Sequence, residues 1–257
     1  MPVRRTEAII LRTRDYSESD RLITFFSKSH GQLTGIAKGA RRSKKRFVHT
    51  LEPFSHVLIT YAEKSTSGLV RIDASELKSA FTALREDIIS LGYASLSCEM
   101  VLEISPERQA NPPLFALLCQ YFAQLEYGAG SENSSLLFQI RLLSLSGYAP
   151  ILQGCLRCAQ QPGAEENWFF SLPQGGLLCP AHRQGHGLYP VSLGTVMLLR
   201  RAQQLPVNKI WRLRFQRRSR EECRFLLLDL IRHHLEKDLK SLKLLQQVGA
   251  LDSTSLA

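Results

Sequence analysis

The sequence contains no apolar run long enough to cross a membrane. Its most apolar stretches, such as residues 225–231, are far shorter than the about twenty apolar residues that a bilayer requires. The first residues, MPVRRTEAIILRTR, hold one brief apolar patch between arginines, with no cleavage site of small residues. Because 44% of the residues are hydrophobic and 22% are charged, we expect a globular protein of the cytoplasm that buries a sizeable core.

The common catalytic motifs are also lacking. The sequence contains no G-x-x-x-x-G-K-[ST], no G-x-S-x-G and no H-E-x-x-H. The acidic pair Glu86 and Asp87 falls on an expected amphipathic helix, whose solvated face would account for it. His233 and His234 are expected at the surface, without a role as a base. We therefore expect a binding protein and not an enzyme.

The positive charge is concentrated in two regions. Of the net charge of +10, residues 1–46 carry +8 and residues 200–224 carry +7, so the remainder is mildly acidic. The densest block, KGARRSKKR at residues 38–46, has six cations and no acid. Such concentrations favour nucleic acid as the partner over an acidic membrane or protein surface, or over simple solvation of loops.

The first third of the chain has the pattern of β-strands. Short segments rich in β-branched and aromatic residues follow one another closely, several with apolar alternation. Five strands in so short a stretch predict a small closed barrel, with an OB-fold favoured over an SH3-like barrel. The expected strands are residues 6–13, 20–27, 32–39, 54–61 and 67–74.

After residue 76 the apolar residues recur at three- and four-residue spacing, which predicts helices. The expected helices are residues 79–104, 113–128, 135–148, 192–205 and 220–247. Between the third and the fourth lies an irregular stretch, residues 150–190, which is rich in Gly, Pro, Gln and Cys. The fold class expected is therefore α+β, with a barrel followed by a helical part.

The irregular stretch contains a candidate zinc site. Cys155 and Cys158 are followed, after twenty residues, by Cys179 and His182. Two pairs of ligands at this spacing suit one tetrahedral, structural zinc ion, and NWFFSLPQGGLL between them predicts a hairpin that brings the pairs together. A set that replaces Cys179 by His186 is the alternative for the fourth ligand; chance clustering and a redox Cys-x-x-Cys are the others.

The remaining cysteines give no sign of such a site. Cys98 and Cys119 lie in apolar helical segments and are expected in the core, and Cys223 is expected on a helix without a special role. Six cysteines in a cytoplasmic chain are more typical of thiols and metal ligands than of disulfides.

The segment EAIILRTRDYSESDRLITFFSKSHGQLTGIAKGARRSKKRF, with LEPF after it, closely resembles the opening of the RecO family of bacterial recombination mediators. The resemblance continues through LREDIISLGYASLSCEM and GYAP into the C-terminal helices. It implies an OB-fold at 1–78, a helical domain at 79–149 and 191–247, a zinc knuckle inserted at 150–190 and a flexible tail at 248–257. His182 stands where many relatives carry a fourth cysteine.

The resemblance also implies partners. Members of the family bind single- and double-stranded DNA, anneal complementary strands and act with RecR. Together they help to load RecA onto DNA covered by single-stranded-DNA-binding protein, whose acidic C-terminal tail RecO recognises. A cytoplasmic, nucleoid-associated location follows, with one structural Zn²⁺ and no covalent chemistry. The rival classes are a zinc-containing DNA-binding transcription regulator and a metallonuclease.

On an OB-fold, the basic block would occupy the end of a strand and the loop after it, beside the ligand groove. A cationic loop there can follow phosphates without reading bases. Tyr16, Phe25, Phe26 and Phe47 are candidates for base stacking, with one of the adjacent phenylalanines expected in the core. The expected DNA-binding residues are Arg12, Arg14, Arg21, Lys38, Arg41, Arg42, Lys44, Lys45 and Arg46.

The second basic region is centred on WRLRFQRRSR, residues 211–220. It is interpreted as a second DNA contact or as a cradle for an acidic peptide. In the second case its cations would lie beside an apolar wall formed by Leu198, Leu199, Leu205 and Trp211. The candidate partner-binding residues are Trp211, Arg212, Arg214, Arg217 and Arg218.

Overall fold

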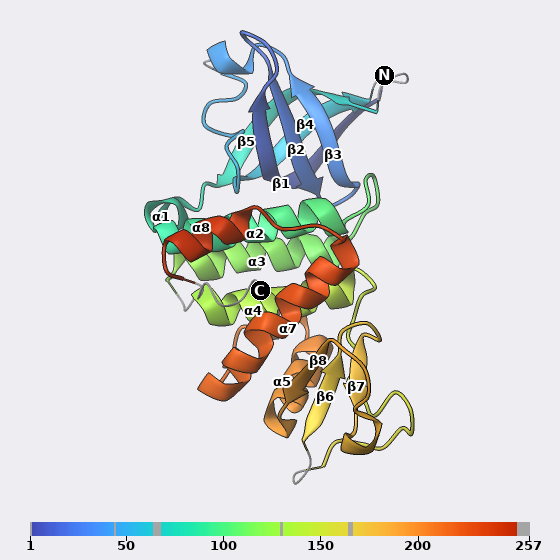
Figure 1. The fold of residues 1–257 in the computed structure, drawn as a ribbon. Coiled ribbons are helices and arrows are strands. Elements are labelled where there is room, and N and C mark those ends of the chain that lie inside the picture. Colours follow the sequence, from blue (N-terminus) through green and yellow to red (C-terminus); the bar gives the residue numbers. More distant parts are fainter. Residues whose placement is uncertain (1, 44, 64–67, 129–130, 164–166, 251–257) are drawn as a thin grey trace. The chain divides into compact units, whose positions relative to one another are not determined.

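The structure, a computed structural model, describes residues 2–43, 45–63, 68–128, 131–163 and 167–250 (Figure 1). The chain forms two compact units, residues 1–128 and 129–257, and each is described by itself. No helix in the described ranges is long and apolar enough to span a membrane. The domain limits expected from the sequence stay predictions.

Five strands of the first unit form a closed barrel in the order β1-β2-β3-β5-β4. The barrel closes because the long first strand pairs antiparallel with both β2 and β4, while β3 and β5 are joined by a short parallel pairing. This order is that of an OB-fold and confirms the prediction. The strands are β1 (Val3–Asp15), β2 (Arg21–Ser27), β3 (Gly31–Ala37), β4 (His56–Glu63) and β5 (Val70–Ser79).

The barrel interior is filled by alternating apolar residues of all five strands, among them Ile23, Phe25 and Tyr61, none of which is exposed. Phe47 and Leu51, from the segment between β3 and β4, belong to the same core. A Cβ on Gly35 would lie 2.6 Å from a side-chain carbon of Val70. Glycine therefore permits the close approach of β3 to β5.

Three helices of the first unit are α1 (Thr82–Glu86), α2 (Ile88–Ile104) and α3 (Pro112–Glu126). Residues on α3 pack against aromatic residues beside the strands, with ring centroids 5.8 Å apart for Phe54 and Phe122. The expected helix over 79–104 is two helices, because Asp87 has an extended backbone and caps α2 through the N–H groups of Ile89 and Ser90. The interpretation of Asp87 as part of a helical face was therefore wrong.

The helices of the second unit are α4 (Ser131–Leu145), α5 (Leu193–Gln204), α6 (Val207–Ile210), α7 (Arg217–Leu235) and α8 (Ser241–Gln247), with α4 packed against α5 and α7. The helical run expected over 220–247 is interrupted. Glu236 adopts a left-handed backbone, with φ of 51°, and ends α7. The turn lets Leu239, Leu242 and Leu245 be buried after it.

The second unit also contains a three-stranded sheet in the order β7-β6-β8 (Figure 1). Its strands are β6 (Trp168–Ser171), β7 (Gly176–Leu178) and β8 (Leu188–Val191). The hairpin predicted for NWFFSLPQGGLL is confirmed, with Gly175 in the left-handed region at φ of 63°. Trp168 and Phe170 are fully buried. This sheet carries one half of the candidate metal site.

Candidate nucleic-acid interface and metal centre

The turn between β1 and β2 is closed by its own hydrogen bonds. The N–H of Tyr16 donates to the carbonyl of Asp20 at 3.0 Å, and the N–H of Asp20 donates to Oγ of Ser17 at 3.1 Å. Small polar residues suit such a turn because their side chains bond the nearby backbone. The turn therefore has a defined shape without burying any of its side chains deeply.

The basic segment, residues 38–46, is held against this turn. The N–H of Gly39 donates to Oδ1 of Asp20 at 2.8 Å, and the N–H of Arg41 donates to the carbonyl of Ser19 at 3.0 Å. The bond from Gly39, with one from Ser19, keeps the pKa of Asp20 below its usual value. We call the turn (residues 16–20) and the basic segment (residues 38–46) together the rim.

Sequence reasoning did not find Asp20 as the residue that joins the two parts of the rim. Its position directly after a serine-rich turn was the available signal, since Asp and Ser commonly bond backbone groups in turns. Gly39 has a left-handed backbone, with φ of 65°, which glycine adopts at little cost and which directs its N–H into this contact.

Most cations expected to bind DNA are exposed on or beside the rim. Within the described residues no ion pair is recorded for Arg14, Lys38, Arg42 or Lys45. Arg46 donates to the carbonyl of Lys38 at 2.9 Å and has no carboxylate partner among those residues. Lys44 lies outside the described residues.

The other three expected cations have acidic neighbours. Arg21 pairs with Glu52 at 2.9 Å and with Asp15 at 3.7 Å, so it has a structural role in the barrel. Arg41 lies 3.7 Å from Asp15, and both side chains are well exposed, so this pair is weak. Partial burial and the charge of Arg14 lower the pKa of Arg12, and Glu103 opposes that shift.

Three of the four candidate stacking residues are buried. Phe25 and Phe26 are both fully buried, although one was expected to face outward, and Phe47 is 5% exposed. The prediction of base stacking is therefore wrong for these three, because both faces of β2 are covered and Phe47 fills the barrel interior. Tyr16, on the rim, is 58% exposed.

Two tight turns carry the four predicted metal ligands. In the first, the N–H of Cys155 donates to the carbonyl of Gln160 at 2.8 Å and the N–H of Ala159 donates back to Cys155 at 2.9 Å. In the second, the 3₁₀ turn Pro180–His182 begins directly after Cys179. The N–H of Leu156 donates to the carbonyl of Leu177 at 2.8 Å, which holds the first turn beside β7.

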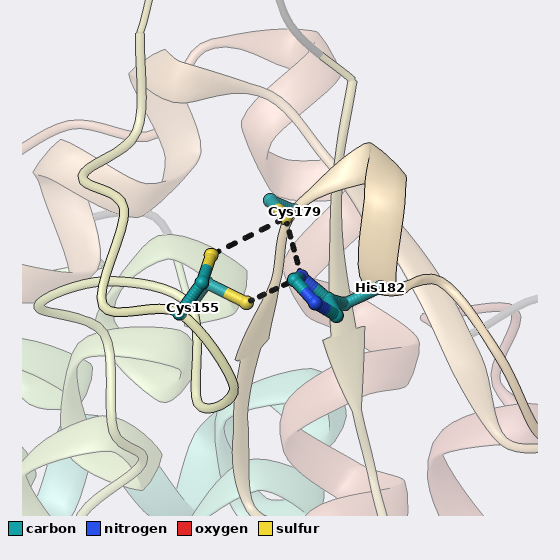
Figure 2. Close-up of side chains that lie close together, drawn as sticks. Cys155, Cys179 and His182 are labelled. Atoms are coloured by element: carbon teal, nitrogen blue, oxygen red, sulfur yellow. Dashed lines mark hydrogen bonds between the residues drawn. The ribbon is translucent and has the colours of Figure 1, made fainter.

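The ligand atoms of Cys155, Cys158, Cys179 and His182 all lie within 4.8 Å of one another. Figure 2 shows Cys155, Cys179 and His182 directed at one point between the two turns. The Sγ atoms of Cys158 and Cys179 are 3.8 Å apart, and Nδ1 of His182 is 3.1 Å from Sγ of Cys179. A tetrahedral ion with sulfur at about 2.3 Å separates two sulfurs by about 3.8 Å.

Three thiolates and one imidazole are a donor set that suits a metal ion, and the site can therefore hold one. Burial alone would raise the pKa of Cys155, but backbone N–H groups of Cys179 and Arg157 hold it at about 6. A thiolate is thus accessible near neutral pH, as metal binding requires. His186 is not part of this cluster in the described part of the chain.

The second basic region has more internal partners than the rim. On α7, Arg217 pairs with Glu221 at 3.0 Å and Arg218 pairs with Glu222 at 2.8 Å. The guanidinium of Arg214 donates to the carbonyl of Trp211. Arg212 is exposed. These cations remain on the surface.

The expected apolar wall of that region is mostly not on the surface. Trp211 is 8% exposed and Leu199 is 1% exposed, so both pack in the core, whereas Leu198 and Leu205 are half-buried. The prediction of an apolar wall was wrong for the two buried residues. Helical spacing does not distinguish an apolar face that lines a groove from one that packs into the core.

The other cysteines show no site. Cys98 is buried, as expected for a core residue, whereas Cys119, also expected in the core, is half-buried. Cys223 lies on α7, as expected, and is buried. Burial raises the pKa of all three thiols, which makes them poor nucleophiles.

Comparison with known proteins finds relatives over almost the whole length of the chain. The family model described as "Recombination protein O N terminal" matches residues 1–81, and "Recombination protein O C terminal" matches residues 85–243. The chain is 43% identical to the DNA repair protein RecO of Syntrophobacter fumaroxidans, over 96% of this chain and 98% of that protein. It is 34% identical to the DNA repair protein RecO of Syntrophus aciditrophicus, over 95% of each. The chain therefore belongs to the RecO family.

Proposed function

We propose that this chain is a DNA-binding recombination mediator in DNA repair and that the rim is its DNA-binding surface. The observation that carries the proposal is the set of exposed cations on the rim and beside it, most of which form no ion pair among the described residues. They lie at the end of an OB-fold barrel where the β1–β2 turn and the segment after β3 are joined by hydrogen bonds. OB-folds bind oligonucleotides with the face of strands 2 and 3 and with loops that include the one between strands 1 and 2. The β1–β2 turn of the rim is that loop.

The chemistry of the rim suits phosphates and not particular bases. Exposed guanidinium and ammonium groups neutralise phosphates and release counterions, which gives affinity for any sequence. Among its described residues the rim has one 3₁₀ turn, Ala40–Arg42, and no α-helix of the kind that enters the major groove for direct readout of a base sequence. Sequence-tolerant binding is what a mediator of recombination needs. The relatives and family models give no support to a transcription regulator.

The test is a charge reversal on the rim. Arg41→Glu with Arg42→Glu should weaken binding by a similar factor on several unrelated oligonucleotides, in an anisotropy titration. Lys237→Glu with Lys240→Glu is the matched control, because it changes the net charge equally at exposed positions of the other unit. Full affinity in the folded rim variant, or equal losses in both variants, would contradict the proposal.

The finer role that we propose is the annealing of complementary strands and, with RecR, the loading of RecA onto DNA covered by single-stranded-DNA-binding protein. The rim supports annealing because neutralised phosphates on two strands repel each other less. The chain acts by binding and performs no covalent chemistry, and it works in the cytoplasm, associated with the nucleoid. A coated-strand annealing assay with and without RecR tests this role.

The second basic region is proposed as the contact for the acidic tail of single-stranded-DNA-binding protein, through Trp211, Arg212, Arg214, Arg217 and Arg218. Its support is charge: several exposed guanidinium groups lie together on and before α7. Trp211, which is buried, would act by positioning the carbonyl group that Arg214 bonds. A labelled tail peptide should bind in a salt-dependent way, and intact binding after Arg217→Ala with Arg218→Ala would exclude the placement.

We also propose that the metal is one structural zinc ion. The support is the closed set of four protein ligands, which leaves no coordination position for water, and the soft thiolates that zinc prefers. When bound, the ion cross-links the turn at Cys155 to the turn at Cys179. Its role is to stabilise this sheet, because metal binding is linked to folding.

A further inference from the structure

The rim contains one exposed aromatic side chain, Tyr16, to which phosphate binding gives no role. Tyr16 is 58% exposed at the start of the β1–β2 turn, while Phe25, Phe26 and Phe47 are buried. We propose that Tyr16 stacks on a base of single-stranded DNA and makes the rim prefer single strands to duplex. This inference rests on the proposed function, and it assigns to one residue the selectivity between the two forms of DNA.

The hydrogen bonds of the turn fix where Tyr16 lies relative to the cations. Its N–H bonds the carbonyl of Asp20 at 3.0 Å, and Oδ1 of the same Asp20 accepts the N–H of Gly39 at 2.8 Å. Tyr16 and Gly39, which lies at the start of the basic segment, are therefore both hydrogen-bonded to Asp20. A strand whose phosphates follow that segment carries its bases past this turn.

The acids of the turn are mostly engaged and do not exclude a nucleic acid. Asp20 accepts bonds from Gly39 and Ser19, and Asp15 lies 3.7 Å from both Arg21 and Arg41. Glu18 remains as an exposed acid in the turn. Arg14, just before the turn in the sequence, and Arg42, in the basic segment, are exposed and form no ion pairs among the described residues.

Stacking discriminates between the two forms of DNA because of where the bases are. In a single strand a base face is available, and stacking on an aromatic ring contributes to binding whatever the base. In a duplex each base already stacks on its neighbours, and opening a step costs a few kcal/mol. Phosphate contacts are made by both forms, so the ring adds affinity for the single strand alone.

The experiment compares the affinities of variants of the full chain for a mixed-sequence single strand and for its duplex. Tyr16→Ala should weaken single-strand binding by about tenfold and leave duplex binding within experimental error. Tyr16→Phe should retain wild-type affinity, because the phenyl ring stacks equally. The salt dependence of Tyr16→Ala should match that of the wild type, because stacking releases no counterions.

Tyr127→Ala is the matched control, since Tyr127 is 81% exposed in the same unit and away from the rim in sequence. It should bind both forms as the wild type does. Equal losses on single strand and duplex, or none on either, would overturn the inference. If the reversal of Arg41 and Arg42 weakens binding while Tyr16→Ala does not, the proposed function stands and this inference alone fails.

Discussion

At the scale of single residues, the structure distinguishes between two sets of metal ligands that the sequence allowed, which differ in whether His186 is included. His182 and His186 both follow Cys179 closely in the sequence, and both offered a fourth ligand. His182 belongs to the 3₁₀ turn after Cys179, with Nδ1 at 3.1 Å from that sulfur. His186 is not part of the cluster within the described residues. The geometry thus favours the set of three cysteines with His182.

Metal analysis of the two histidine variants tests this ligand set. The wild type, purified without chelator, should contain close to one equivalent of zinc, and His186→Ala should keep it. His182→Ala should contain clearly less zinc and unfold at a lower temperature, because a ligand is lost and metal binding is linked to folding. Loss of metal from His186→Ala, whether or not His182→Ala keeps its metal, would show that the assignment of the ligand set is wrong.

At the scale of elements, the cap of α2 shows how one acid divides a predicted helix. The carboxylate of Asp87 accepts the N–H groups of Ser90 at 2.8 Å and Ile89 at 3.4 Å. These bonds satisfy donors that the first turn of a helix leaves free. A hydrogen bond from the side chain of Ser90, together with these N–H groups, keeps the pKa of Asp87 below its usual value. The cap is therefore strongest while the carboxyl group is ionised.

Replacement of the cap should lower stability in a pH-dependent way. Asp87→Ala should reduce the free energy of unfolding by about 1 kcal/mol at neutral pH, as measured by urea denaturation. Because the folded pKa is lowered, the contribution of Asp87 is present above its usual pKa and is lost as the pH falls through the folded value. The difference from the wild type should therefore shrink in acid. Glu86→Ala is the control, and an equal loss there would refute the cap.

The strands of the barrel and the hairpin at Gly175 were predictable because each follows from local alternation and turn residues. The short strand β8 was missed, since Leu188–Val191 contains a proline and pairs with β6 from a distance in the sequence. The prediction that one of Phe25 and Phe26 stacks on a base was wrong for a related reason. Alternation assigns one side of a strand to solvent and does not show what covers that side. Both errors concern tertiary contacts.

In the candidate sites, too, only the features with a local sequence signal were predictable. The ligands near Cys155 were predictable from spacing, because zinc requires fixed pairs of donors. The cations of the rim were evident from composition, but the bond from Gly39 to Asp20 joins segments about twenty residues apart and has no local signal. The burial of Trp211 had no signal either, since an alternating basic and apolar pattern also occurs in exposed segments.

At the scale of the whole molecule, the distribution of charge accounts for the proposed activity. The net charge is +10, and it is carried by two regions on an otherwise mildly acidic chain. One region lies in each compact unit, and the cations of the rim have fewer acidic partners than the arginines of α7. Long-range attraction by both regions would speed the encounter with DNA, and the rim would hold it.

The dependence of DNA affinity on salt tests this account most directly. If the rim neutralises about six phosphates, log K should fall against log salt with a slope of roughly −4 on single strands and −5 on duplex. In the variant with Arg41→Glu and Arg42→Glu, the single-strand slope should be shallower by about 1.4, because two contacts are lost. A wild-type slope near zero, or an unchanged slope in that variant, would contradict the rim as the surface that binds DNA.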